Sequence, residues 1–146
     1  MHICLVFAGT EDGGMETHVV ELAEMLSIRH QISVIGHQVH QKRFHKRIRF
    51  LSIDLDRWRF NPNLKRGVNA LLIEIQPDVI HAHGRKAGHI IGSIKNKQKV
   101  PTVLSLHNPA NASRIAKSFD TVIGVSSSVL TNLRHDNAIV VFNGRG

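Results

Sequence analysis

The chain has 146 residues, of which 42% are hydrophobic and 21% charged, proportions that are typical of one globular domain and exclude a disordered chain. Its formal net charge of +8 indicates a phosphate-rich partner. The single cysteine, Cys4, can form no intramolecular disulfide, and no apolar run is long enough for a signal peptide or a membrane span. We therefore expect a cytoplasmic protein.

Seven short segments carry the apolar and β-branched residues that are typical of buried strands, and helical patterns separate most of them. They are residues 3–8, 32–36, 48–53, 79–83, 102–107, 121–125 and 138–142. This alternation predicts an α/β fold: a Rossmann-like parallel sheet of about seven strands with helices on both faces.

Four helices are expected between these strands. Apolar residues at helical spacing from Met15 to Leu26 predict the first. Asn61 and Pro62 supply an N-cap and a first-turn proline for the second, which Pro77 ends. The third is expected over residues 85–94 and the fourth over residues 127–134.

A glycine-rich loop joins the first strand to the first helix, in residues 9–14. Free backbone N–H groups at the positive end of a helix can bind a phosphate, and Gly13 and Gly14 would let the backbone approach it without a Cβ in between. The alternative is an ordinary strand-to-helix turn.

Polar residues follow three other strands. They are His81-Ala-His83-Gly84, His107-Asn108-Pro109 and Ser126-Ser-Ser128. Each group by itself is typical of a hydrogen-bonded strand end or a helix cap. Because ligands of open parallel sheets bind beyond the carboxyl ends of the strands, the four loops together predict a binding site.

Several segments occur in an order and spacing that resemble a known family. They are Gly13-Gly14-Met-Glu16-Thr-His18, Pro77-Asp-Val-Ile-His81-Ala-His83, Val-Ile-Gly-Val-Ser126 and Val-Val-Phe-Asn143-Gly144. They resemble the N-terminal half of the retaining glycosyltransferases of family 4, which have the GT-B fold. The resemblance extends over essentially the whole chain, although Arg145 and Gly146 depart from the residues often found there.

The resemblance implies a two-domain enzyme that transfers a sugar from a nucleotide-diphosphate donor with retention of the anomeric configuration. This chain would be the acceptor-side domain, with the donor-binding domain absent. His107 would lie beside the transferred sugar as the catalytic candidate, and we expect it to orient a hydroxyl rather than abstract a proton. The expected contacts to the donor diphosphate and substrate are Gly13, Gly14, Glu16, His18, His83, Asn108 and Ser126.

We expect no metal and no cofactor, because backbone N–H groups at a helix start can stabilise a leaving diphosphate. His81 and His83 share one face of a strand and could begin a metal site. No cluster of Cys, His or carboxylate residues nearby in the sequence completes a ligand set.

A basic segment, residues 42–66, holds nine of the 19 Lys and Arg residues, interleaved with aromatic residues. We expect it to rest on the anionic inner face of the cytoplasmic membrane, or to bind the diphosphate of a lipid-linked glycan acceptor in lipopolysaccharide or polysaccharide biosynthesis of a bacterial type. The alternative is a core strand beside a solvated charged loop. The expected contacts are Lys42, Arg43, Lys46, Arg47 and Trp58.

Two rival functions remain open from the sequence. An NADP-dependent reductase or dinucleotide-binding module would use Lys42 and Arg43 for a 2′-phosphate, but the Gly-x-Gly-x-x-Gly fingerprint is missing. The other rival function is a basic binding module without catalysis. Since no nucleic-acid-binding motif is present, we expect only nonspecific affinity for nucleic acid.

Overall fold

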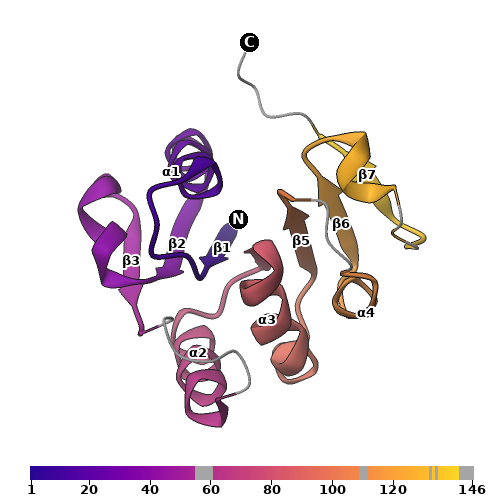
Figure 1. The fold of residues 1–146 in the computed structure, drawn as a ribbon. Coiled ribbons are helices and arrows are strands. Elements are labelled where there is room, and N and C mark those ends of the chain that lie inside the picture. Colours follow the sequence, from indigo (N-terminus) through magenta and orange to yellow (C-terminus); the bar gives the residue numbers. More distant parts are fainter. Residues whose placement is uncertain (55–60, 109–111, 132, 134, 142–146) are drawn as a thin grey trace.

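The computed structural model describes residues 1–54, 61–108, 112–131, 133 and 135–141. Within these residues seven parallel strands form one sheet in the order β3-β2-β1-β4-β5-β6-β7 (Figure 1). The strands are β1 (His2–Phe7), β2 (Gln31–Gly36), β3 (Arg49–Ser52), β4 (Val79–His83), β5 (Thr102–Leu106), β6 (Thr121–Gly124) and β7 (Ala138–Val140). The predicted Rossmann-like parallel sheet is confirmed.

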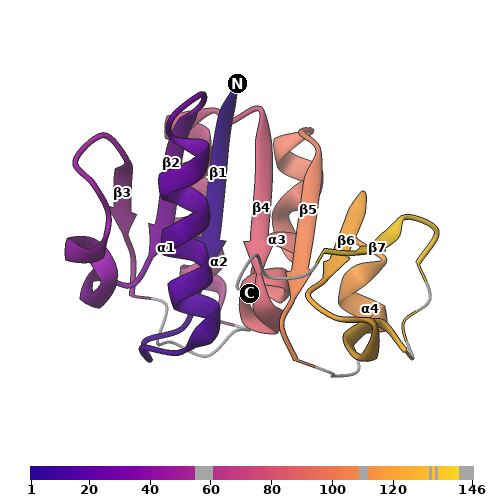
Figure 2. The same cartoon turned by 90° about the horizontal axis from the view of Figure 1, so that it is seen from above.

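Helices cover both faces of this sheet. Helix α1 (Gly14–Leu26) lies on one face, and α2 (Pro62–Ile75), α3 (Gly84–Gln98) and α4 (Ser113–Ala116) lie on the other (Figure 1). Viewed from above, α1 lies in front of the strands, with α2 and α3 behind them (Figure 2). No helix in the described part of the chain is long and apolar enough to cross a membrane.

The core has two layers because successive side chains of a strand point to opposite faces of the sheet. Leu5 and Phe7 of β1 pack with Val19 of α1. Cys4 and Val6 pack with the helices of the other face. Burial raises the pKa of the Cys4 thiol, which therefore stays protonated in the core.

The boundaries of α2 follow the expected signals. The Asn61 side chain accepts a hydrogen bond from the Asn63 N–H at 2.9 Å. Gln76 ends the helix in the left-handed conformation with φ 45°, directly before Pro77. Local cap chemistry was therefore sufficient to place this helix.

One expectation about helices needs correction, and two short helices were not predicted. The helix predicted over residues 127–134 is the short 3-10 helix η2 (Ser127–Leu130), with residues 132 and 134 outside the described part of the chain. A second 3-10 helix, η1 (Gln38–Arg43), and helix α4 were not predicted. In helix η1 the His37 side chain accepts a hydrogen bond from the Val39 N–H at 3.2 Å, and His40 packs on Phe7. Neither contact produces an apolar repeat in the sequence from which the helix could be predicted.

Candidate functional site

The strand order reverses between β1 and β4. From β1 the chain runs outward through β2 to β3, then returns to β4 and runs outward in the other direction to β7. In an open parallel sheet, such a reversal leaves a crevice at the carboxyl ends of the two central strands, because their connections leave toward opposite sides.

A cavity of about 270 Å³ lies at this point of the sheet. The ends of β1, β4 and β5 contribute to its walls, together with the first turns of α1 and α3. Its lining residues are Ala8, Gly9, Met15, His83, Gly84, Arg85, Lys86, Ala87, Leu106, His107 and Asn108. Of the predicted site residues, His83, His107 and Asn108 are therefore brought together.

A histidine cluster, His18, His83 and His107, lies beside this cavity. Each ring offers a nitrogen within 4.8 Å of the nitrogens offered by the other two. The His18 and His107 rings meet edge to face with centroids 5.2 Å apart. His81 stacks on His83 at 4.0 Å and its Nε2 lies 2.6 Å from Ser105 Oγ, so the two histidines share one strand face as predicted.

His83 and His107, which line the cavity, are neutral at physiological pH. Burial, reinforced by the neighbouring His81, His107 and His18 rings, lowers the pKa of His83 well below its usual range. Burial and the facing His18 ring lower the pKa of His107 to about 4. His107 is therefore a weaker base than the near-neutral pKa of a free histidine suggests, which favours orientation of a hydroxyl over proton abstraction.

The first turn of α3 lines the cavity, although the sequence patterns did not single out Arg85 and Lys86. Gly84 has a φ of +85°, and a Cβ there would come within 2.9 Å of Met15 Sδ, so both its conformation and its packing require glycine. Arg85 and Lys86 follow at the helix start and line the cavity. Two cations directly after the His83-Gly84 strand end were the signal in the sequence.

The glycine loop is held from inside by Glu16, which is buried. Its carboxylate fills the space that a Cβ of Gly9 would occupy and lies 3.2 Å from the position of a Gly13 Cβ. Glu16 therefore supports the loop, and a carboxylate in this position does not favour a bound phosphate on the inner side. Gly13 and Glu16 do not line the cavity.

Gly14, by contrast, is exposed, and a Cβ built there meets no atom within 4 Å. The loop is fixed from outside by two contacts with η1: His40 Nε2 lies 2.8 Å from the Gly9 carbonyl oxygen, and Arg43 pairs with Asp12 at 3.1 Å. The backbone at Gly14, at the start of α1, is therefore exposed to solvent in a loop that these contacts hold in place.

Ser126 lies away from the cavity. Its hydroxyl lies 2.9 Å from Ser128 Oγ, and it precedes η2 at the end of β6. Ser126 is therefore not among the residues that line the cavity, and its contact with a substrate stays a prediction.

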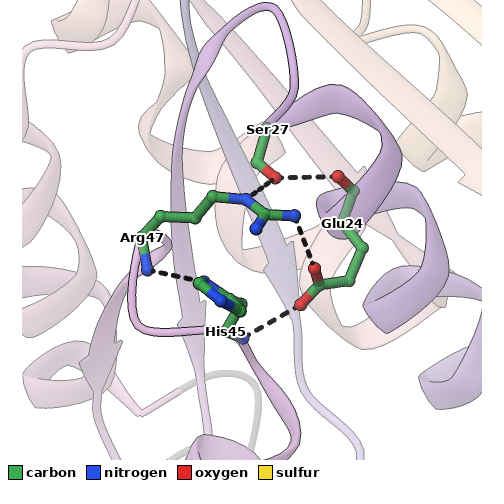
Figure 3. Close-up of polar contacts among 4 residues, drawn as sticks. All are labelled: Glu24, Ser27, His45 and Arg47. Atoms are coloured by element: carbon green, nitrogen blue, oxygen red, sulfur yellow. Dashed lines mark hydrogen bonds and ion pairs between the residues drawn. The ribbon is translucent and has the colours of Figure 1, made fainter.

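Two of the predicted surface cations are bound within the protein. Arg47 donates to Ser27 Oγ at 2.7 Å and pairs with Glu24 at 2.9 Å, while the backbone N–H of His45 donates to the same carboxylate (Figure 3). Arg43, beside Asp12, also donates to Thr17 Oγ1 at 3.2 Å. Both arginines attach the chain before β3 to the outside of α1.

Lys42 and Lys46 are exposed. The prediction of a cationic surface therefore rests on these two lysines more than on the arginines. Trp58, the remaining member of that prediction, lies outside the described residues.

A parallel sheet with this order and a cavity at its reversal point defines a Rossmann-like ligand-binding domain. The family model of Glycosyltransferase Family 4 matches residues 12–144. The chain belongs to this family, and its fold is that of the N-terminal domain of a GT-B glycosyltransferase, as the sequence resemblance implied.

Solved structures with the same fold share little sequence with the chain. HepE of Anabaena in complex with UDP superposes with a TM-score of 0.77 at 19% identity, over 99% of this chain and 44% of HepE. MurG of Acinetobacter baumannii gives 0.75 at 14% identity, over 99% and 46%. The lipopolysaccharide outer core galactosyltransferase WaaB gives 0.67 at 12% identity, over 97% and 45%. The chain thus spans less than half the length of these proteins.

No curated protein sequence matches the chain. The family assignment therefore rests on the family model, and the structural likeness establishes the fold. Because the chain belongs to a glycosyltransferase family, the alternative of a dinucleotide-binding module is not supported.

Proposed function

We propose that this chain is the acceptor-side domain of a hexosyltransferase that moves a sugar, with retention, from a nucleoside-diphosphate sugar to a lipid-linked glycan acceptor. One observation carries the proposal: the start of α3, the glycine loop and His107 meet at one cavity where the strand order reverses. Solved structures of HepE contain UDP and UDP-glucose, which supports a donor of this class.

The anionic part of the donor would bind at the start of α3. The backbone N–H groups of this first turn and the cations Arg85 and Lys86 would stabilise negative charge, which grows on the diphosphate as the glycosidic bond breaks. Exposed Gly14 offers a second stretch of backbone that a diphosphate can approach closely.

His107 would orient the reacting hydroxyl. Its half-buried, neutral ring can accept a hydrogen bond from an acceptor hydroxyl, whereas an imidazolium could only donate. His83 lies beside it, with Nδ1 3.4 Å from His107 Nε2, and helps to set the orientation of the ring.

A donor-binding domain would complete the cleft. HepE and MurG, which share this fold, are about twice as long as the chain. In this arrangement the chain supplies the acceptor side, and donor selection resides in the second domain.

Lys42 and Lys46 would place the enzyme on the inner face of the cytoplasmic membrane. Exposed cations are attracted to anionic lipid headgroups, and a lipid-linked acceptor is reached from that surface. Lys42 lies in η1, and Lys46 lies three residues after its end. Because η1 contacts the glycine loop, the proposed membrane surface and the cleft lie on connected parts of the fold.

Sugar transfer by the chain together with its natural C-terminal continuation tests the proposal, with a panel of nucleoside-diphosphate sugars and a lipid-diphosphate glycan acceptor. We expect His107→Ala to lower kcat/KM by about 100-fold, the scale for losing a group that positions a reacting hydroxyl. Gly14→Val should raise the KM for the donor while thermal unfolding stays unchanged, because the added side chain enters open space.

His135→Gln is the matched control, since His135 lies at the opposite edge of the sheet with its Nε2 2.8 Å from the Phe119 carbonyl oxygen. It should leave transfer unchanged. Full activity in both His107→Ala and Gly14→Val would mean that neither residue takes part in the reaction, and this result would overturn the proposal.

A further inference from the structure

The histidine cluster draws its three rings from separate parts of the chain: His18 from α1, His83 from the end of β4 and His107 from the residue after β5. No metal was expected from the sequence, since no cluster of Cys, His or carboxylate residues lies near His81 and His83 in the chain. Folding supplies the other two imidazoles, and among the described residues this is the group whose ligand atoms gather closely enough to hold an ion.

The buried member of the cluster lacks a full set of partners. The His83 side chain is 1% exposed, and among the described residues its Nε2 has no hydrogen-bond partner. A buried polar atom without a partner is costly and is usually explained by a bound water, an ion or a catalytic role.

The other nitrogen of His83 faces His107. Its Nδ1 lies 3.4 Å from His107 Nε2, a long contact between the two rings. The His83 ring thus lies against His107 through Nδ1, and the nitrogen without a partner is Nε2, on the other side of the ring.

We propose that His18, His83 and His107 form a binding site for a divalent transition-metal ion of the zinc class. Three imidazoles without a thiolate or carboxylate select zinc, copper or nickel over magnesium and calcium, which prefer oxygen ligands. At a spacing of 4.8 Å the nitrogens would have to come more than about 1 Å closer together to share a zinc ion.

Three protein ligands leave a coordination position open. Because His83 and His107 also line the cavity, that position is accessible to an oxygen atom of a ligand bound there. A neutral imidazole has one lone pair, so a His107 ring that binds the ion does not also accept the hydrogen bond from a hydroxyl that the proposed function gives it. The metal site is tested by metal binding alone.

The experiment is a zinc titration of the chelator-treated 146-residue chain, in competition with a chromophoric chelator, followed by the visible spectrum of the Co²⁺ form. We expect one zinc ion per chain and a four-coordinate Co²⁺ spectrum. His18→Gln and His107→Gln, both at half-buried positions, should each weaken binding by about 100-fold or more, since even outer-shell changes cost 10- to 100-fold.

His135→Gln is again the matched control and should bind zinc as the unchanged chain does. Circular dichroism of the metal-free variants establishes that they fold. Absence of stoichiometric binding overturns the proposal, as does an affinity of the two cluster variants equal to that of the unchanged chain. An equal loss in His135→Gln does so too, since it would assign the zinc to scattered surface histidines.

Discussion

The histidine cluster and the basic segment were both predicted as ligand sites, yet the fold treats them in opposite ways. The cluster gathers rings from three elements around a cavity and leaves a buried nitrogen of His83 without a partner among the described residues. In the basic segment, Arg43 and Arg47 are paired with carboxylates of the same domain. Uncharged groups brought together at a cavity are available to a ligand, whereas charged groups near opposite charges become part of the scaffold.

This comparison also separates two sources of interaction energy. Burial sets the protonation state of the histidines, so their contribution to the free energy of unfolding depends on pH. The arginines act through partly exposed ion pairs, so their contribution is small and depends on salt. Each of the following predictions tests one side of this contrast.

The largest expected effect is the pH dependence of stability from the buried histidines. The folded state has pKa values of about 4 for His81 and His107, below the usual 6.5, so between these values the unfolded chain binds more protons than the folded one. The free energy of unfolding should therefore be highest above pH 6.5 and fall toward pH 4, by up to about 1.4 kcal/mol per pH unit for each such histidine.

Urea unfolding between pH 7 and 4.5 in the presence of a chelator measures this dependence, with His81→Gln and His107→Gln for comparison. Each substitution should flatten the curve because one lowered pKa is removed. If the variants keep the slope of the unchanged chain, the rings are already protonated when folded, and the contrast with the basic segment disappears.

An intermediate effect is expected at the exposed lysines. Each cation near an anionic surface contributes about 1 kcal/mol, so Lys42→Ser with Lys46→Ser should weaken binding to vesicles containing phosphatidylserine by roughly 30-fold. Vesicle flotation at low and physiological salt gives the measurement. Lys117, exposed beside α4 on the other face of the sheet, provides the matched control.

In the Lys117→Ser chain, binding should change little, although a positive charge is lost. Equal losses from both surfaces would mean that net charge alone attracts the vesicles. Unchanged binding in the double variant would mean that Lys42 and Lys46 do not contribute to membrane binding.

The smallest effect concerns the Arg47–Glu24 pair. The side chains are 44% and 34% exposed, so a double-mutant cycle with Arg47→Met and Glu24→Gln should give a coupling of about 0.2–1 kcal/mol that decreases in high salt. Denaturant unfolding of the four chains yields this value. A coupling of several kcal/mol would contradict the view that this segment is a solvated scaffold.

Much of the fold follows from local sequence signals. The apolar run of β1 and the Asn61, Pro62 and Pro77 signals around α2 each report on a few neighbouring residues, and both elements occur where predicted. Helix η1 escaped prediction because its stability depends on a histidine cap and on the packing of His40 against Phe7, a residue distant in the sequence.

The site was predicted only in part for the same reason. His83, His107 and Asn108 follow strand ends, and the carboxyl ends of parallel strands necessarily share an edge of the sheet. That His18 would face His83 and His107, and that Glu16 would fill the glycine loop, depends on the rotation and tilt of α1 over the sheet.

The sequence by itself determined the class of fold, the order of most elements and the family, because hydrophobic periodicity, caps and motif spacing are local properties. The tertiary structure alone decided which polar groups meet, which arginines are paired and which histidines lose their charge. Those outcomes depend on distances between elements and on burial from water, and neither is a property of neighbouring residues in the chain.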